Sequence, residues 1–220
     1  MFGEKASELS LEAVIQELIS YTSKDQSNIT IFDLSGIPFD VLSITVSLIT
    51  RLLFDYSYYF RRANKKCDTP LLLVYEEAHK YAPRSDLAKY RASLLAIERV
   101  AKEGRKYGTS LLIASQRPSE ISETIFSQCS NFLAMRLTNP DDQAYVKRLL
   151  PDTLGNLTAG LPGLEAGEAL LIGDSTVMPC LVYVDKCSPE PSSSDIPFFE
   201  IWTEQWRSVD FSRISREWRK

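Results

Sequence analysis

The sequence predicts an α/β fold in which helices cover a mostly parallel sheet. Two short runs of mainly apolar residues, at positions 71–75 (LLLVY) and 110–114 (SLLIA), have the length and composition of strands buried on both faces. Segments with apolar residues at helical spacing lie between these runs and on either side of them. This alternation of strands and helices is typical of layered α/β proteins.

The first predicted elements are a helix, a strand and a second helix. Apolar residues at helical spacing predict a helix over residues 9–19, and residues 28–33 (NITIFD) predict a strand because they are rich in β-branched side chains. Asp40 is expected to cap a second helix over residues 41–64. The first half of this helix is apolar on nearly every side, so it is expected to lie buried against the sheet.

The later elements continue the alternation. A long basic helix is predicted after the first buried strand, and Gly108 ends it before the second buried strand begins. The predicted elements from there on are the basic helix over 87–107, a helix over 122–129, a strand over 131–137, a helix over 141–150 and a hairpin over 168–185 that turns near Asp174 and Ser175.

Three regions are predicted along the chain. Residues 1–187 form the core domain, and residues 188–194 (SPEPSSS) have the composition of a linker. Residues 195–220 form a terminal arm that contains three tryptophans. Their indoles could stack on nucleic-acid bases, but an arm that packs on a neighbouring domain or subunit is the favoured interpretation.

The composition excludes several classes of protein. The chain has 220 residues, 44% of them apolar, and a net charge of −4, which suits a globular domain and not a uniformly basic nucleic-acid coat. Its four cysteines form no CxxC pair and His79 is its single histidine, which argues against a zinc site or a disulfide framework. The most apolar stretch, residues 41–54, is too short for a membrane span. We therefore expect a reducing, cytoplasmic setting without membrane contact.

Positive charge is concentrated in one band of the sequence. Residues 51–107 carry thirteen basic and seven acidic side chains, a net charge of +6, whereas residues 1–50 carry two basic and seven acidic ones. A solvated helix surface is the simpler interpretation of this band. A surface that faces a polyanion is the alternative.

Two glutamates follow the first buried strand. Glu76 and Glu77 are expected at the carboxyl edge of the sheet, where open parallel sheets bind their ligands. Adjacent carboxylates there point to different sides, so Glu76 could hold a hydrated Mg²⁺ while Glu77 orients and deprotonates an attacking water. An acidic pair in a solvated loop is the alternative.

Two further residues could act on phosphate. Gln116 follows the second buried strand, and its amide could bind both a water and a γ-phosphate; a solvated turn residue is the alternative. Arg105 follows Gly104 near the end of the basic helix and could clamp phosphate oxygens across a subunit boundary, although charge pairing at the helix end is the simpler interpretation. Arg117 is interpreted as a local ion-pair partner, and His79 as a structural group without a catalytic role.

Three segments together resemble the HerA family of hexameric DNA-translocating ATPases, within the broader FtsK and HerA group of RecA-like P-loop motors. They are residues 33–40 (DLSGIPFD), 71–83 (LLLVYEEAHKYAP) and 98–122 (ERVAKEGRKYGTSLLIASQRPSEIS). The resemblance covers roughly residues 29–199. It implies a RecA-like layered sheet, ATP and Mg²⁺ as cofactors, a Walker B pair at Glu76 and Glu77, a polar sensor at Gln116 and an arginine acting in trans at Arg105.

The resemblance also implies partners. It implies a homo-oligomeric, hexameric ring that threads double-stranded DNA, with a terminal arm that reaches the neighbouring subunit. It implies work with a nuclease or another effector, in DNA repair by end resection or in antiviral defence against phage.

One motif of that family is missing. Such motors cradle phosphates with GxxxxGK[ST], and none of the nine glycines in this sequence is followed by lysine. In the family this Walker A element precedes the region present here, so the chain resembles the carboxyl-terminal half of the motor. We expect a partial sheet in which two strands face the place of the missing strand with unpaired backbone groups. Either the sheet closes differently or another polypeptide fills the gap.

Two functions are predicted from these observations. The first is the Walker B and sensor half of a HerA-like hexameric ATPase that moves double-stranded DNA, active only when a Walker A-bearing segment completes it. The second is a catalytically inactive, truncated ATPase-like scaffold that serves as an adaptor for an effector enzyme. A DEAH-type helicase is suggested by residues 76–79 (EEAH), but residues 115–118 (SQRP) do not fit that group.

Overall fold

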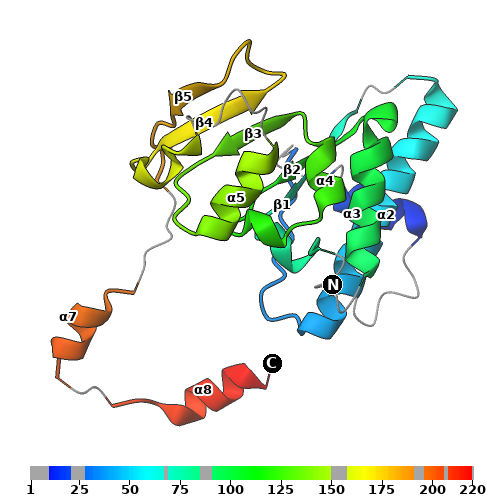
Figure 1. The fold of residues 1–220 in the computed structure, drawn as a ribbon. Helices are drawn as coiled ribbons and strands as arrows, with labels where there is room; N and C mark the ends of the chain where they lie inside the picture. The colour runs from blue at the N-terminus through cyan, green and yellow to red at the C-terminus, as the bar shows by residue number, and fades with distance from the viewer. Residues whose placement is uncertain are drawn as a thin grey trace. The chain divides into compact units, whose positions relative to one another are not determined.

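The chain forms two compact units, Met1–Val184 and Asp185–Lys220 (Figure 1). None of the described helices is both long and apolar enough to cross a membrane. The computed structural model describes residues 10–20, 28–66, 69–84, 91–149, 158–190, 196–205 and 208–219.

The helices of the first unit largely match the sequence prediction. Asp40 lies in the first turn of α2 and does not cap it, because the helix begins at Phe39 with Pro38 as its N-cap. Gly108, with a φ of 77°, ends the basic helix as predicted. The α-helices are α1 (Leu11–Leu18), α2 (Phe39–Asn64), α3 (Ala92–Glu103), α4 (Glu123–Gln128) and α5 (Pro140–Leu149), and the 3-10 turn η3 (Gly104–Tyr107) continues α3. Of the predicted basic helix, residues 87–90 lie outside the described residues.

The described strands form two sheets. β1 (Leu71–Tyr75) and β2 (Thr109–Ile113) pair in parallel. β3 (Asn131–Ala134), β4 (Glu168–Gly173) and β5 (Cys180–Tyr183) form an antiparallel sheet that contains the predicted hairpin. Over the residues that the structure describes, β2 and β3 do not pair with each other. This break is what a layered sheet without a central strand is expected to show.

The predicted strand over residues 28–33 is wrong, because no described residue of this segment lies in a strand. Its burial does alternate: Phe32 and Leu34 are half-buried, whereas Ile31 is 86% exposed. Leu34 packs against the core. A composition rich in β-branched side chains favours a strand, but a strand also needs a hydrogen-bonded neighbour.

The prediction that β1 and β2 are buried on both faces is also wrong. Leu72 and Val74 of β1 are 58% and 54% exposed, and Leu112 of β2 is 46% exposed. The first half of α2 is likewise covered on one side only, since Val41 and Ile44 are exposed. The physical reason is the same for the two strands and for α2. Apolar side chains on one face pack inward, and no described element covers the other face.

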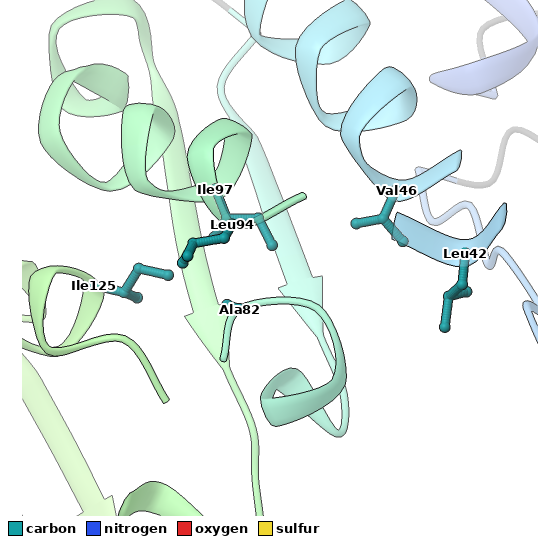
Figure 2. Packing of buried hydrophobic residues seen from close by; sticks show 6 residues of the cluster. All are labelled: Leu42, Val46, Ala82, Leu94, Ile97 and Ile125. Atoms are coloured by element: carbon teal, nitrogen blue, oxygen red, sulfur yellow. The ribbon is translucent and has the colours of Figure 1, made fainter. Parts of the chain in front are cut away.

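One hydrophobic core cluster of the first unit lies between the β1–β2 sheet and its helices (Figure 2). Its buried members come from α2, α3, α4 and the loop after β1, and they are Leu42, Val46, Ala82, Leu94, Ile97 and Ile125. Tyr75, Leu111 and Ile113 pack against them from the strands. This packing fixes the carboxyl ends of β1 and β2 against the helical layer.

A partly buried hydrogen bond joins β1 to α2. The hydroxyl of Tyr75 lies 2.6 Å from Oγ1 of Thr50, which is fully buried. Burial raises the pKa of Tyr75 to about 12, although the hydrogen bond with Thr50 opposes this shift.

Tyr75 is therefore expected to make the fold sensitive to alkali. Because the folded state raises this pKa, its neutral phenol stabilises the fold fully below pH 10, and that stabilisation is lost as the pH rises from 10 to about 12. Over this range the unfolding free energy of Tyr75→Phe should fall by about 2 kcal/mol less than that of the wild type. Urea denaturation against pH measures the difference, with Tyr183→Phe as an exposed control. Equal pH dependence of wild type and Tyr75→Phe would contradict the expectation.

The described residues of the second unit form the helices α7 (Phe198–Thr203) and α8 (Phe211–Trp218), and neither has a buried residue. Phe211, Ile214 and Trp218 recur at helical spacing along α8, and all three are exposed. Trp202 of α7 is 78% exposed, and Trp206 lies outside the described residues. Within the described residues of this unit, no element covers the apolar face of α8.

Candidate functional site

The two glutamates lie in a short loop at the carboxyl end of β1. The backbone N–H of Ala114 donates to the carbonyl of Tyr75 at 3.0 Å, and the N–H of Ala78 donates to the carbonyl of Ala114 at 3.0 Å. Glu76 and Glu77 are therefore looped out between two hydrogen bonds to a single residue of the neighbouring chain segment. The pairing of β1 with β2 thus places both carboxylates at the sheet edge.

Glu77 has an unusual backbone conformation. Its φ of 50° and ψ of 44° lie in the left-handed region, which costs a residue with a Cβ about 1 to 2 kcal/mol. Its carboxylate Oε2 lies 3.4 Å from Nδ1 of His79. Backbone strain of this kind is concentrated at functional sites, and here it occurs at the residue that the sequence assigns to the attacking water.

The negative charges of Glu76 and Glu77 both affect the pKa of Tyr81. The pKa of Tyr81 is raised, first by burial and then by the negative charges of Glu77 and Glu76. Glu77 is half-buried and Glu76 is exposed. The two side chains therefore share one region of the sheet edge while differing in their access to solvent.

The loop after β2 lies alongside the loop after β1. The N–H of Arg84 donates to the carbonyl of Glu120 at 2.8 Å, and the N–H of Ser122 donates to the carbonyl of Ala82 at 3.0 Å. These backbone hydrogen bonds keep the two loops together beyond the ends of the strands.

Gln116 lies in the turn directly after β2 and is exposed. Oγ of Ser115 accepts a hydrogen bond from the N–H of Arg117 at 3.0 Å, which closes the turn around Gln116. Arg117 also pairs with Glu120 at 3.0 Å, which confirms its interpretation as a local ion-pair partner. The structure thus brings Gln116 to the same sheet edge as the two glutamates.

Arg105 does not lie at that edge. It is exposed in η3, before β2 begins, and so lies at the opposite end of this strand from Gln116. A Cβ at Gly104 would stand 2.5 Å from the carbonyl oxygen of Thr109, so only glycine allows η3 to approach the strand this closely. Among the described residues Arg105 forms no ion pair, and it lies in the last turn of η3, where the helix carboxyl end favours a cation.

An open depression of about 580 Å³ borders Arg105. Arg61, Lys106 and Tyr107 line it together with Arg105. Arg61 comes from the last turn of α2, so the fold joins basic side chains from two segments far apart in the sequence. The positive charge over residues 51–107 indicated basic side chains in this region, but not that Arg61 and Arg105 line the same depression.

Comparison with curated proteins finds relatives that match most of the chain. The DNA double-strand break repair helicase HerA of Sulfurisphaera tokodaii is 30% identical over 207 residues, which are 88% of this chain and 40% of that protein. The HerA helicase of Sulfolobus acidocaldarius is 33% identical over 79% of this chain and 35% of its own length. A probable helicase of Methanocaldococcus jannaschii is 31% identical over 83% of this chain and 35% of its own length.

The chain belongs to the HerA family. It spans two fifths or less of the length of these three relatives. No family model matches the sequence.

Solved structures support the fold of this HerA-family chain. The genome packaging NTPase B204 from Sulfolobus turreted icosahedral virus 2 aligns in its complex with sulfate at a TM-score of 0.51 and 13% identity, over 84% of this chain and 78% of that one. Its complex with ATP-gammaS aligns at a TM-score of 0.50 over the same shares. The likeness concerns the fold alone, and it confirms the prediction of a partial RecA-like α/β fold.

The carboxylates at the sheet edge fit the expected Mg²⁺ only as a hydrated ion. Within the part of the HerA-family chain that the structure describes, no group of three or more His, Cys, Asp and Glu side chains could hold a metal ion. Glu76 is exposed and forms no ion pair there. Because Mg²⁺ keeps several waters and needs one or two carboxylates, Glu76 fits a hydrated Mg²⁺.

Sequence reasoning missed the place of His79. Its Nδ1 lies 3.1 Å from Oγ of Ser115 and 3.4 Å from the carboxylate of Glu77, so the ring contacts both loops of the HerA-type motifs. Its position two residues after Glu77, in a turn at a strand end, was the signal that could have found it.

Proposed function

We propose that this chain supplies the Walker B and sensor half of a HerA-like hexameric ATPase that moves double-stranded DNA. The observation that carries the proposal is the placement of Glu76, Glu77 and Gln116 at one carboxyl edge of a parallel sheet. In this proposal a segment with GxxxxGK[ST], which the 220 residues do not contain, completes the site.

Each residue at the edge has a distinct task. Glu76 holds hydrated Mg²⁺ through water, and the bound ion supplies charge neutralisation at the phosphates of ATP. Glu77, held by its local contacts, orients the attacking water and accepts its proton. The amide of Gln116 hydrogen-bonds the water and a phosphate oxygen without adding charge.

Arg105 acts on the nucleotide of a neighbouring subunit. Its exposure, and its position at the far end of β2 from Gln116, support action in trans, because it does not reach the glutamates of its own sheet edge. The exposed apolar face of α8 supports the packing of a terminal arm, residues 195–220, on the next subunit of a homo-oligomeric ring. In this proposal residues 188–194 link the arm to the core of residues 1–187.

The names of the relatives, DNA double-strand break repair helicases, support double-stranded DNA as the substrate of the motor. A nuclease or a defence effector is the proposed protein partner, in DNA repair or antiviral defence, and the proposed location is the cytoplasm.

The open depression lined by Arg61, Arg105, Lys106 and Tyr107 is the surface proposed to bind the phosphate backbone of DNA. Arg61→Ala and Lys106→Ala should each weaken binding of the chain to duplex DNA and lower the slope of log affinity against log salt by about 1. Fluorescence anisotropy with a labelled duplex between about 50 and 200 mM salt measures both quantities. Lys147→Ala, on an exposed position of α5, is the control and should leave them unchanged. Loss of affinity without a change in salt slope would count against phosphate contact.

The second candidate function is a catalytically inactive, ATPase-like scaffold that serves as an adaptor for an effector enzyme. ATP hydrolysis separates the two functions. The purified chain is assayed with and without duplex DNA, alone and mixed with the polypeptide encoded immediately upstream. Turnover that appears on mixing supports the motor, whereas persistent oligomers without turnover under every condition support the scaffold.

A further inference from the structure

We propose that His79 is a positioning residue that holds the carboxylate of Glu77 and the turn around Gln116 in one arrangement. The inference rests on the proposed function, since it assigns a task within the same site.

The ring of His79 lies between the two loops. It belongs to the 3-10 turn η2 (Ala78–Lys80) directly after Glu77, and only 13% of its side chain is exposed. Nδ1 lies 3.1 Å from Oγ of Ser115 and 3.4 Å from Oε2 of Glu77. One ring atom therefore contacts the residue before the sensor and the residue assigned as the base.

A hydrogen on Nδ1 accounts for both contacts. The carboxylate of Glu77 can only accept, and Oγ of Ser115 has two lone pairs, one of which accepts from the N–H of Arg117. With a hydrogen on Nδ1, the ring donates toward both oxygens. The opposite tautomer would turn a lone pair of Nδ1 toward the carboxylate of Glu77, which is unfavourable.

This arrangement links the sensor to the base. Oγ of Ser115 closes the turn around Gln116, so a movement of that turn changes the position of the oxygen that Nδ1 contacts. The same nitrogen restrains the carboxylate of Glu77, whose left-handed backbone also needs local support. His79 thus transmits the position of the Gln116 turn to the group that activates water.

The first test uses the fact that His79 is the single histidine of the chain. The ¹⁵N spectrum of the full chain with labelled histidine contains one imidazole, so its tautomer is read directly. We expect the hydrogen on Nδ1, and a shift of the ring resonances in Ser115→Ala and Glu77→Gln but not in Ser127→Ala or Glu76→Gln. A hydrogen on Nε2 with no response to Ser115→Ala or Glu77→Gln would overturn the proposed contacts.

The second test measures hydrolysis by the chain completed with its Walker A-bearing polypeptide. His79→Ala should lower kcat by about 10²-fold, as a base misplaced by about 1 Å does, and leave KM unchanged. His79→Asn, whose amide N–H can stand near the place of Nδ1, should recover most of the loss, whereas His79→Gln, whose amide lies farther out, should not.

Glu77→Gln separates failure of this inference from failure of the proposed function. If Glu77→Gln is inactive while His79→Ala turns over like the wild type, the inference about His79 is wrong and the function stands. If Glu77→Gln is as active as the wild type, the proposed function itself fails. Equal losses in His79→Ala, His79→Asn and His79→Gln would also overturn the inference, since they would show a role in folding only.

Discussion

Glu77→Gln is expected to lower ATP turnover of the completed ATPase by about 10²- to 10⁴-fold, the usual contribution of a general base. The glutamine keeps the size of the side chain and its ability to accept a hydrogen bond, but it cannot take a proton from water. Affinity for ATP should stay within about threefold of the wild type, because the lost interaction is made in the transition state. Single-turnover hydrolysis and equilibrium nucleotide binding measure the two quantities.

The control for this substitution is Glu165→Gln, in an exposed position before β4. It changes the net charge in the same way and should leave turnover unchanged. If Glu77→Gln also retained full turnover, Glu77 would not be the base and the proposed function would be wrong.

Arg105→Ala is expected to lower turnover by about 10³- to 10⁵-fold, the range measured for arginine fingers. Nucleotide binding should persist, because Arg105 lies at the opposite end of β2 from the glutamates of its own subunit. Lys147→Ala, on α5, removes a similar positive charge and serves as the control.

Mixed assemblies test whether Arg105 acts in trans. Subunits with Arg105→Ala and subunits with Glu77→Gln are each inactive alone, but some junctions of a mixed ring join an intact Arg105 to an intact Glu77. Turnover should therefore return when the two variants are mixed. Mixtures that remain inactive, although native gels show that both variants enter the same ring, would contradict action in trans.

Much of the fold could be predicted because it depends on local pattern. The end of α2 at Asn64, the stop at Gly108 and the hairpin of β4 and β5 follow from apolar spacing and turn residues. Exposure could not be predicted in the same way. Leu72 and Val74 have the composition of a strand buried on both faces, but burial depends on which elements cover each face, and local pattern does not contain that information.

One part of the candidate site could likewise be predicted from the sequence, and another part could not. The proximity of the glutamate loop to Gln116 could be predicted, because neighbouring parallel strands end at the same sheet edge. The contact of His79 with Ser115 could not, since it depends on the left-handed turn at Glu77 and on the hydrogen bonds of the loops. The meeting of Arg61 with Arg105 is also non-local, because it requires the end of α2 to pack near η3.

A double-mutant cycle on Glu77 and Gln116 tests the central proposal most directly, that both side chains act on one water. Single-turnover hydrolysis is measured for the wild type, Glu77→Gln, Gln116→Ala and the double variant, each completed with the Walker A-bearing polypeptide. Residues that act as a unit are strongly non-additive, so the double variant should be little slower than Glu77→Gln alone. Losses that multiply independently would show that Glu77 and Gln116 do not share a water, and would contradict the proposal.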